Sequence, residues 1–195
     1  MFDTIKNYYK NLVPALTDSE WMALQGILTV KQIRKGEYII KEGQVCNHVL
    51  FINKGLVRLF YNANGKEISV GFFPENSYVS EYESFLTRCP ATQNIDVLAD
   101  SEIFELHYDH VQLLYKQYAV FQEFGRKMAE FLFIMLNQRN TALLVLSPEQ
   151  RYRQMVVETN LYQLVPQYML ASFIGITPEH LSRIRKKTAE RKASK

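Results

Sequence analysis

Residues 30–106 alternate between apolar and polar side chains, and this period of two constrains the fold more than any other feature of the 195-residue chain. The runs that we expect to be strands are residues 38–40, 49–52, 56–60, 68–72, 95–98 and 102–106. Asn64-Gly65 is a strong hairpin signal, and we interpret Asn53-Lys54-Gly55 as the turn of another hairpin. Many short strands with regular turns predict a closed β barrel or jelly roll of roughly 80 residues.

Helical patterns flank this region. Residues 1 to about 30 have apolar side chains at helical spacing, and Thr17-Asp18-Ser19-Glu20 marks a helix start. A long helix is expected from about His110 to Asn140. It has an apolar seam at alternating steps of four and three residues, made of Leu114, Tyr118, Phe121, Gly125, Met128, Leu132 and Met135. We expect this seam to form a dimer interface; the alternative is one wide stripe buried within a single chain.

The chain starts a new unit after the long helix. Ser147-Pro148-Glu149 combines a helix cap, a proline at the first helical position and an acid in the first turn. We therefore divide the chain into a barrel domain with the long helix, residues 1–140, and a C-terminal helical domain, residues 141–195. The fold class is α+β.

Residues 170–187 form a pattern of two short helices joined by a tight turn. Gly175 ends the first helix, because glycine tolerates the left-handed backbone of helix exits. Thr177 and Pro178 begin the second helix as its N-cap and first residue. This is the layout of a DNA-reading helix-turn-helix. The alternative is a surface amphipathic helix with a solvated basic face.

The charge distribution favours duplex DNA as the partner. The net charge is only +3, yet residues 183–195 hold seven basic residues against one acid, Glu190. Leu181 and Ile184 should face inward. The residues expected to meet DNA are Thr177, Glu179, His180, Ser182, Arg183, Lys186 and Lys187, and Arg191 and Lys192 can also neutralise phosphates.

Other features narrow the setting and the chemistry. The sequence shows no signal peptide and no apolar run long enough to span a bilayer. Cys46 and Cys89 are too few for a disulfide framework, so we expect buried structural thiols and a cytoplasmic location; the alternative is that they are redox or iron–sulfur ligands. We expect no metal and no catalytic residue, because the barrel strands offer only His48 toward the His-x-His set of a cupin-type enzyme.

The order of barrel, long helix and helix-turn-helix resembles the cyclic-AMP receptor/fumarate-nitrate regulator (Crp/Fnr) family of bacterial transcription factors over nearly the whole chain. The specific points are Lys35-Gly36-Glu37 followed by Glu42-Gly43, residues 51–58, and Leu181-Ser182-Arg183-Ile184-Arg185. The resemblance implies a cyclic-nucleotide-binding-like jelly roll and a homodimer on a two-fold-symmetric operator. RNA polymerase is the further partner that it implies.

In the family's cyclic-nucleotide sensors, a short loop and helix between two strands hold the ligand. By this resemblance Glu81 matches the ribose-binding Glu and Thr92 the phosphate-binding Ser, while Ala91 stands where an Arg clamps the phosphate. The candidate pocket residues are Glu81, Tyr82, Arg88, Ala91 and Thr92. Arg88 could replace the Arg only after a loop shift, and the alternative role of Glu81 is a helix cap or a salt bridge. We therefore assign no cofactor and do not expect cyclic AMP; the pocket takes another small molecule or is closed.

The family's base-reading pattern is roughly Arg-Glu-x-x-x-Arg. Pro178 replaces the first Arg here, while Glu179 and Arg183 are retained, so the operator should differ. Any wing of the DNA-binding domain has to come from residues 161–166. The leading function is a dimeric, sequence-specific transcription regulator. The alternative is a cytosolic module that binds a cyclic nucleotide or another small molecule and acts through protein partners.

Overall fold

The computed structural model describes residues 1–158 and 161–193, with side chains described for residues 1–156 and 163–188. The chain forms two compact units. The first contains Met1–Leu59 and Phe72–Phe133, and the second contains Phe60–Gly71 and Ile134–Lys195. The boundary that we predicted after residue 140 lies inside a continuous helix, α5 (Ala119–Val145). No pattern in the sequence indicated that residues 60–71 belong with the C-terminal helices.

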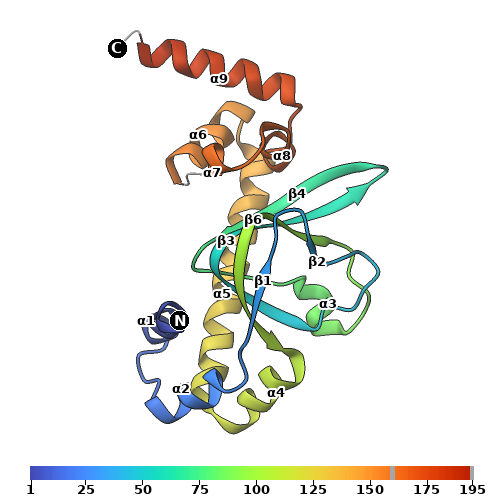
Figure 1. Ribbon diagram of the computed structural model, residues 1–195. Helices are drawn as coiled ribbons and strands as arrows, with labels where there is room; N and C mark the ends of the chain where they lie inside the picture. Colours follow the sequence, from blue (N-terminus) through green and yellow to red (C-terminus); the bar gives the residue numbers. More distant parts are fainter. Residues whose placement is uncertain (159–160, 194–195) are drawn as a thin grey trace. The chain divides into compact units, whose positions relative to one another are not determined.

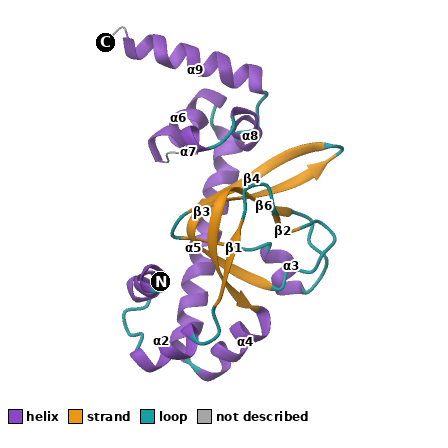
Figure 2. Cartoon of the chain, viewed as in Figure 1, coloured by secondary structure: helices purple, strands orange, loops and turns teal. Residues whose placement is uncertain are grey.

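An antiparallel sheet forms the centre of the first unit (Figures 1 and 2). Its strands are β1 (Thr29–Ile33), β2 (Tyr38–Ile40), β3 (His48–Ala63), β4 (Lys66–Pro74), β5 (Ser77–Val79) and β6 (Asn94–His107). The strand order is β1-β6-β3-β4, with β2 paired to β6 and β5 paired to β3. This confirms the expected strand-rich region between residues 30 and 106.

One predicted hairpin is wrong. Residues 49–52 and 56–60 are not two strands around a turn at Asn53-Lys54-Gly55, because β3 runs through them without a break. Gly55 has φ +102, and a Cβ there would lie 2.1 Å from the Ser101 Oγ. The glycine thus lets β3 approach β6 closely instead of reversing the chain. Likewise, residues 95–98 and 102–106 belong to the single strand β6.

The hairpin predicted at Asn64-Gly65 is confirmed. These two residues join β3 to β4 and have φ values of 53° and 76°. Positive φ at both central residues is what a type I′ turn requires, and Asn-Gly supplies it at low cost. The local sequence therefore specifies the end of this β3–β4 hairpin.

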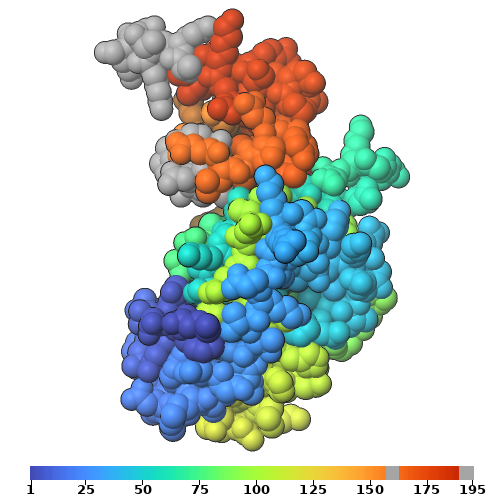
Figure 3. Space-filling model, viewed as in Figure 1, coloured from blue at the N-terminus to red at the C-terminus, as the bar shows by residue number. Residues whose placement is uncertain are grey.

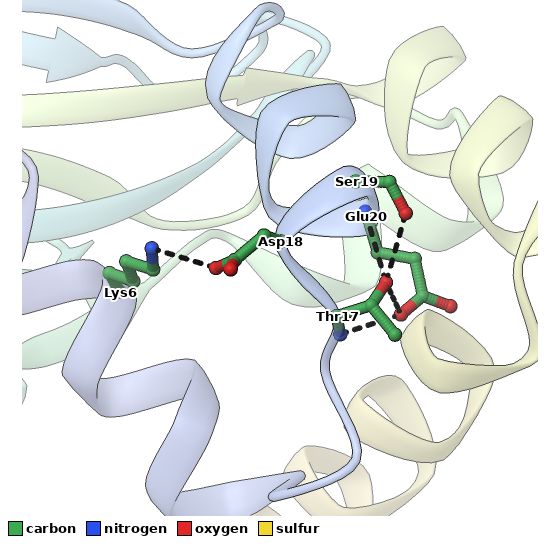
Figure 4. Close-up of polar contacts among 5 residues, drawn as sticks. All are labelled: Lys6, Thr17, Asp18, Ser19 and Glu20. Carbon is green, nitrogen blue, oxygen red and sulfur yellow. Dashed lines mark hydrogen bonds and ion pairs between the residues drawn. The ribbon is translucent and has the colours of Figure 1, made fainter.

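The N-terminal segment consists of α1 (Asp3–Leu12) and α2 (Asp18–Gln25), coloured blue on the first unit in Figure 3. Thr17 and Glu20 form a capping box: the Glu20 N–H donates to the Thr17 Oγ1 at 3.3 Å, and the Thr17 N–H donates to the Glu20 Oε2 at 2.9 Å (Figure 4). Lys6 binds Asp18 at 3.2 Å and ties α1 to the start of α2.

The predicted long helix is two helices. After α3 (Tyr82–Thr87) and β6, the chain forms α4 (Tyr108–Gln117) and then α5, with Tyr118 in an extended conformation between them. Helix α5 also continues past Asn140 to Val145. The seam predicted over residues 114–135 is therefore interrupted, since Leu114 and Phe121 stand on different helices.

The core of the first unit unites the N-terminal helices, the sheet and the first part of α5. The Tyr9 and Phe124 rings stack with centroids 3.9 Å apart, and Tyr78 lies edge-on to both rings. Phe121 is buried on the same cluster. Aromatic packing thus holds α1 and α5 against strand β5.

The second unit combines the tip of the β3–β4 hairpin, Phe60–Gly71, with the end of α5 and the helices that follow it. These are α6 (Pro148–Glu158), α7 (Leu161–Leu164), α8 (Gln167–Phe173) and α9 (Pro178–Ala193). Ser147 caps α6 as predicted, because its Oγ accepts a hydrogen bond from the Gln150 N–H at 3.3 Å. Residues 161–166, where we placed any wing, begin with the helix α7, so the described part of this segment contains no wing strand.

Candidate nucleic-acid interface and effector site

A tight turn joins α8 to α9, as the sequence predicted. Gly175 has φ +74, the left-handed conformation expected at this helix exit. The Ile176 N–H donates to the Ala171 carbonyl at 2.9 Å, and the Gly175 N–H donates to the Ser172 carbonyl at 3.1 Å. These two bonds form a Schellman motif, which satisfies the last carbonyls of α8 and ends the helix at a defined residue.

Helix α9 has one buried face and one exposed polar face. Thr177 caps it, since its Oγ1 accepts a hydrogen bond from the His180 N–H at 3.3 Å. Leu181 and Ile184 are buried, which confirms that they face inward. The exposed candidates for DNA contact are Thr177, Glu179, Ser182, Arg183, Lys186 and Lys187, while His180 is half-buried. Arg191 and Lys192 lie outside the residues whose side chains are described.

The local environment at the start of α9 favours the ionised form of its acid. The backbone amide of Glu179, the Thr177 hydroxyl and the charge of Arg183 lower the pKa of the Glu179 carboxyl. A carboxylate in this position accepts hydrogen bonds, and the guanidinium at Arg183 donates them. The exposed face therefore begins with one acceptor and one fork-shaped donor, which is a combination suited to base edges.

A cleft of about 370 Å³ lies between the start of α6 and the middle of α9. Its lining residues are Ser147, Glu149, Gln150, Arg153, Ile184, Lys187 and Thr188. Arg153 and Lys187 add positive charge to the cleft, and Glu149 opposes it.

The end of α8 is held by side chains that sequence analysis missed. The Arg139 guanidinium donates to the Phe173 carbonyl at 3.1 Å and lies 4.0 Å from the Phe173 ring centroid. The Arg151 Nε donates to the Ile174 carbonyl at 2.9 Å. These arginines have no motif around them, and only their partners reveal the role. They fix the position from which α9 departs.

Glu81 serves as the N-cap of α3. Its side chain is buried, and its Oε2 accepts a hydrogen bond from the Ser84 N–H at 2.7 Å. Its Oε1 accepts one from the Thr92 hydroxyl at 3.4 Å. The structure thus brings Glu81 and Thr92 together and gives Glu81 the helix-capping role that we kept as the alternative.

Arg88 is occupied by contacts within its own unit. Its Nη1 donates to the Cys46 carbonyl at 2.9 Å, its Nη2 donates to the Asn47 side chain, and its guanidinium carbon lies 4.2 Å from the Tyr108 ring centroid. Moving Arg88 toward a bound phosphate would break these contacts. They make it a structural residue at the C-cap of α3.

The remaining pocket candidates differ in exposure. Ala91 is buried, and its main chain is bonded to the loop before β3: its N–H donates to the Gln44 carbonyl and its carbonyl accepts from the Gly43 N–H, each at 2.8 Å. Tyr82 and Thr92 are exposed. Ala91 therefore brings no positive charge to the site, and the Arg88 guanidinium is already bonded to other groups.

The residues of the predicted dimer seam differ in burial between its start and its end. Leu114 and Phe121 are buried in the core of the first unit, the Met128 Sδ accepts a hydrogen bond from the Tyr8 hydroxyl at 3.5 Å, and Gly125 packs on Tyr115. Farther along α5, Leu132 is half-buried and Met135 is exposed. The apolar residues exposed beside them are Phe131, Phe133, Ile134 and Leu136. The residues at the start of the seam therefore pack against other parts of the same chain.

Two histidines meet although the sequence did not suggest it. His107 is the last residue of β6, not a residue beyond the strands, and its ring centroid lies 5.1 Å from that of His48 on β3. Among the described residues, no group of three or more His, Cys, Asp or Glu side chains is arranged to hold a metal ion.

Cys46 is buried as expected, but Cys89 is exposed, which corrects that prediction. In the part of the chain that the structure describes, no helix has the length and apolarity needed to cross a membrane.

Comparison with known proteins assigns the fold to a class. Residues 30–118 match the family model of the cyclic nucleotide-binding domain. The antiparallel sheet with its helices is a cyclic-nucleotide-binding fold of the kind found in catabolite activator proteins. No curated protein matches the sequence.

Solved structures match most of the chain. The catabolite activator protein of Thermus thermophilus is 20% identical over 92% of this chain and 87% of its own, with a TM-score of 0.58. FixK2 of Bradyrhizobium japonicum is 14% identical over 85% of this chain and 86% of its own, with a TM-score of 0.72. A protein of Eubacterium rectale assigned to the Crp/Fnr family of transcriptional regulators is 15% identical over 93% of this chain and 88% of its own, also with a TM-score of 0.72. At these identities the likeness shows the fold.

Proposed function

We propose that this chain is a cytoplasmic, dimeric transcription regulator of the Crp/Fnr type that binds DNA sequence-specifically through α8 and α9. The exposed face of α9 carries this proposal. Glu179 and Arg183 stand on that face, opposite the buried Leu181 and Ile184, directly after the turn at Gly175. This arrangement is that of a recognition helix packed on a supporting helix. RNA polymerase is the protein partner that such a regulator implies.

The proposal includes a homodimer formed through the distal part of α5. Ile134 is 54% exposed and Phe131 is 57% exposed, so this helix presents apolar surface that a second copy can cover. We place the interface there, at Leu132, Met135 and their exposed neighbours. Ile134→Glu should yield monomers in light scattering, whereas Leu113→Glu, the same kind of change at a residue 48% exposed on α4, should leave the dimer intact.

The sensor part of the proposal is a nucleotide site that is lost or retuned. Ala91 supplies no charge for a cyclic phosphate, Arg88 is bonded elsewhere, and Glu81 already caps α3. A buried anion beside Glu81 would receive no counter-charge from Ala91 or Arg88. Another small molecule or no effector fits these residues better than cyclic AMP does.

DNA binding is tested first by selecting a duplex from a random pool with the purified chain. We expect a two-fold-symmetric site with half-sites about one helical turn apart. Arg183→Ala should weaken binding to this duplex by about 1–3 kcal/mol and relax base choice at one position. Lys10→Ala, on the exposed side of α1, removes the same charge and should have little effect.

Two results would contradict the proposal. An equal loss for Arg183→Ala on random and selected DNA would show that Arg183 reads no base. Failure to select any sequence, together with a protein interaction that does not depend on salt, would favour the alternative of a small-molecule module acting through protein partners.

A further inference from the structure

The side chain of Ser172 on α8 is hydrogen-bonded to the β3–β4 hairpin. The main-chain N–H of Ser69 on β4 donates to the Ser172 Oγ at 2.8 Å, and that hydroxyl donates to the Glu67 carbonyl at 3.2 Å. Ser69, Glu67 and Ser172 all belong to the second unit. A single hydroxyl therefore joins two main-chain groups of a strand to a helix.

The position of these groups on the strand explains the contact. Strand β4 ends the order β1-β6-β3-β4, so one of its edges is not paired with a neighbouring strand in that order. Residues two apart on a strand direct their main-chain groups to the same edge, as Glu67 and Ser69 do here. Ser172 satisfies one acceptor and one donor of this edge, in the way that a neighbouring strand does.

Ser172 also lies close to the turn that starts α9. It is followed by Phe173 and Ile174, whose carbonyls are held by Arg139 and Arg151. The end of α8 is thus attached to three different elements immediately before the turn at Gly175. The attachment at Ser172 leads to the hairpin, and the strands of this hairpin continue into the first unit.

We propose that Ser172 is a positioning residue that couples the β3–β4 hairpin to the DNA-reading helix α9. This inference rests on the proposed function, because it assigns to the hairpin the control of a DNA-binding helix. A displacement of β3 or β4 in the first unit reaches α9 through the Ser172 hydroxyl. Loss of this hydroxyl frees the end of α8 from the strand edge and loosens the departure of α9.

The chain offers matched variants for the test. Ser172→Ala removes the shared hydroxyl, and Ser172→Thr keeps it. Ser69→Ala removes a different hydroxyl: the Ser69 Oγ is buried without a hydrogen-bond partner among the described residues, while the Ser69 main-chain N–H is kept. Ser69→Ala is therefore the matched control. It removes a serine hydroxyl at the same contact but keeps both hydrogen bonds of the Ser172 hydroxyl.

Hydrogen exchange of the full-length protein without DNA is the first measurement. We expect Ser172→Ala to speed exchange of the Ser69 amide and of amides in residues 178–188, and we expect Ser172→Thr and Ser69→Ala to match the wild type. If Ser172→Ala changes neither region, or only the Ser69 amide, the coupling is refuted. This result does not depend on DNA binding, so it remains decisive even if the proposed function fails.

Binding to the selected duplex is the second measurement. Ser172→Ala should lose about tenfold in affinity, the size expected from one hydrogen bond that orients a binding element. In the wild type, the duplex should slow exchange of the Ser69 amide, because coupling between two sites is reciprocal. Wild-type affinity in Ser172→Ala, or an unchanged Ser69 amide when the duplex binds, would overturn the proposal while leaving DNA binding itself established.

Discussion

Arg58 and Asp96 form a buried, bidentate ion pair between β3 and β6. The Arg58 Nε donates to the Asp96 Oδ1 at 2.9 Å, and its Nη2 donates to the Asp96 Oδ2 at 2.6 Å. Both side chains are almost fully buried, at 2% and 11% exposed. The two parallel hydrogen bonds set the relation of these long strands at a point where both side chains are largely shielded from water.

Removal of one partner should destabilise the first unit strongly. Arg58→Met or Asp96→Asn breaks the buried ion pair, and we expect a loss of about 3–5 kcal/mol in the free energy of unfolding. Urea denaturation measures this. The exposed pair Arg126–Glu130 is the control, since Arg126→Ala should cost less than about 1 kcal/mol. Equal losses at the two sites would contradict the importance of burial.

Gly55 should resist substitution more than Gly65 does. Both have positive φ, but a Cβ on Gly55 meets Ser101, whereas a Cβ on Gly65 meets nothing within 4 Å. Gly65→Ala pays only for backbone strain, about 1–2 kcal/mol. Gly55→Ala combines this strain with the clash, and the two together cost about 2–4 kcal/mol. Thermal unfolding of the two variants separates these effects, and an equal fall in Tm would refute the close approach of β3 to β6.

Cyclic AMP should not stabilise the protein. A ligand that binds only the folded state raises Tm, and about 1 mM nucleotide would reveal any site with a Kd below roughly 0.1 mM. We expect no change in Tm, because Ala91 has no charge and the Arg88 guanidinium is bonded to other groups. Neither residue can therefore neutralise a phosphate near Glu81. A clear rise in Tm that Glu81→Gln abolishes would show that the nucleotide site is intact and that our assignment is wrong.

Acidification should destabilise the chain in part through His48. Burial is the main cause that lowers the pKa of His48 below its ordinary 6.5; nearby Glu105 opposes the shift, and His107 and Lys31 add to it. The unfolded chain therefore binds a proton that the folded chain resists, so stability is full above pH 6.5 and falls as the pH drops below it. Urea denaturation at pH 7.5 and 5.5 should show a smaller fall for His48→Gln than for His110→Gln, an exposed control. An identical fall in both would contradict this role.

The short-range signals in the sequence predicted the structure well. Asn64-Gly65 forms its turn, Thr17 and Glu20 form a cap, and Gly175 with Thr177 ends α8 and starts α9. Each of these features satisfies backbone groups within a few residues, so the information is local. The burial of Leu181 and Ile184 followed in the same way, from helical spacing.

Features with distant partners could not be predicted in this way. Gly55 signals a turn in isolation, but Ser101 on β6 makes it a point of close approach within a continuous strand. No sequence motif marks Arg88, and its role follows from its contacts with the Cys46 carbonyl and the Tyr108 ring. The apolar seam that begins at Leu114 is interrupted by the extended backbone of Tyr118. Periodicity states which face of a helix is apolar, but it does not state which surface covers that face.

The sequence by itself therefore determined the strand-rich region, the helical ends, the turns and the polar face of α9, because propensity, capping and periodicity act over a few residues. Only the tertiary structure decided that Arg58 pairs with Asp96, that Glu81 caps α3 beside Thr92, and that Ser172 joins α8 to β4. In these contacts a buried polar group must find a partner, and chain topology, not sequence spacing, determines which partner lies within reach.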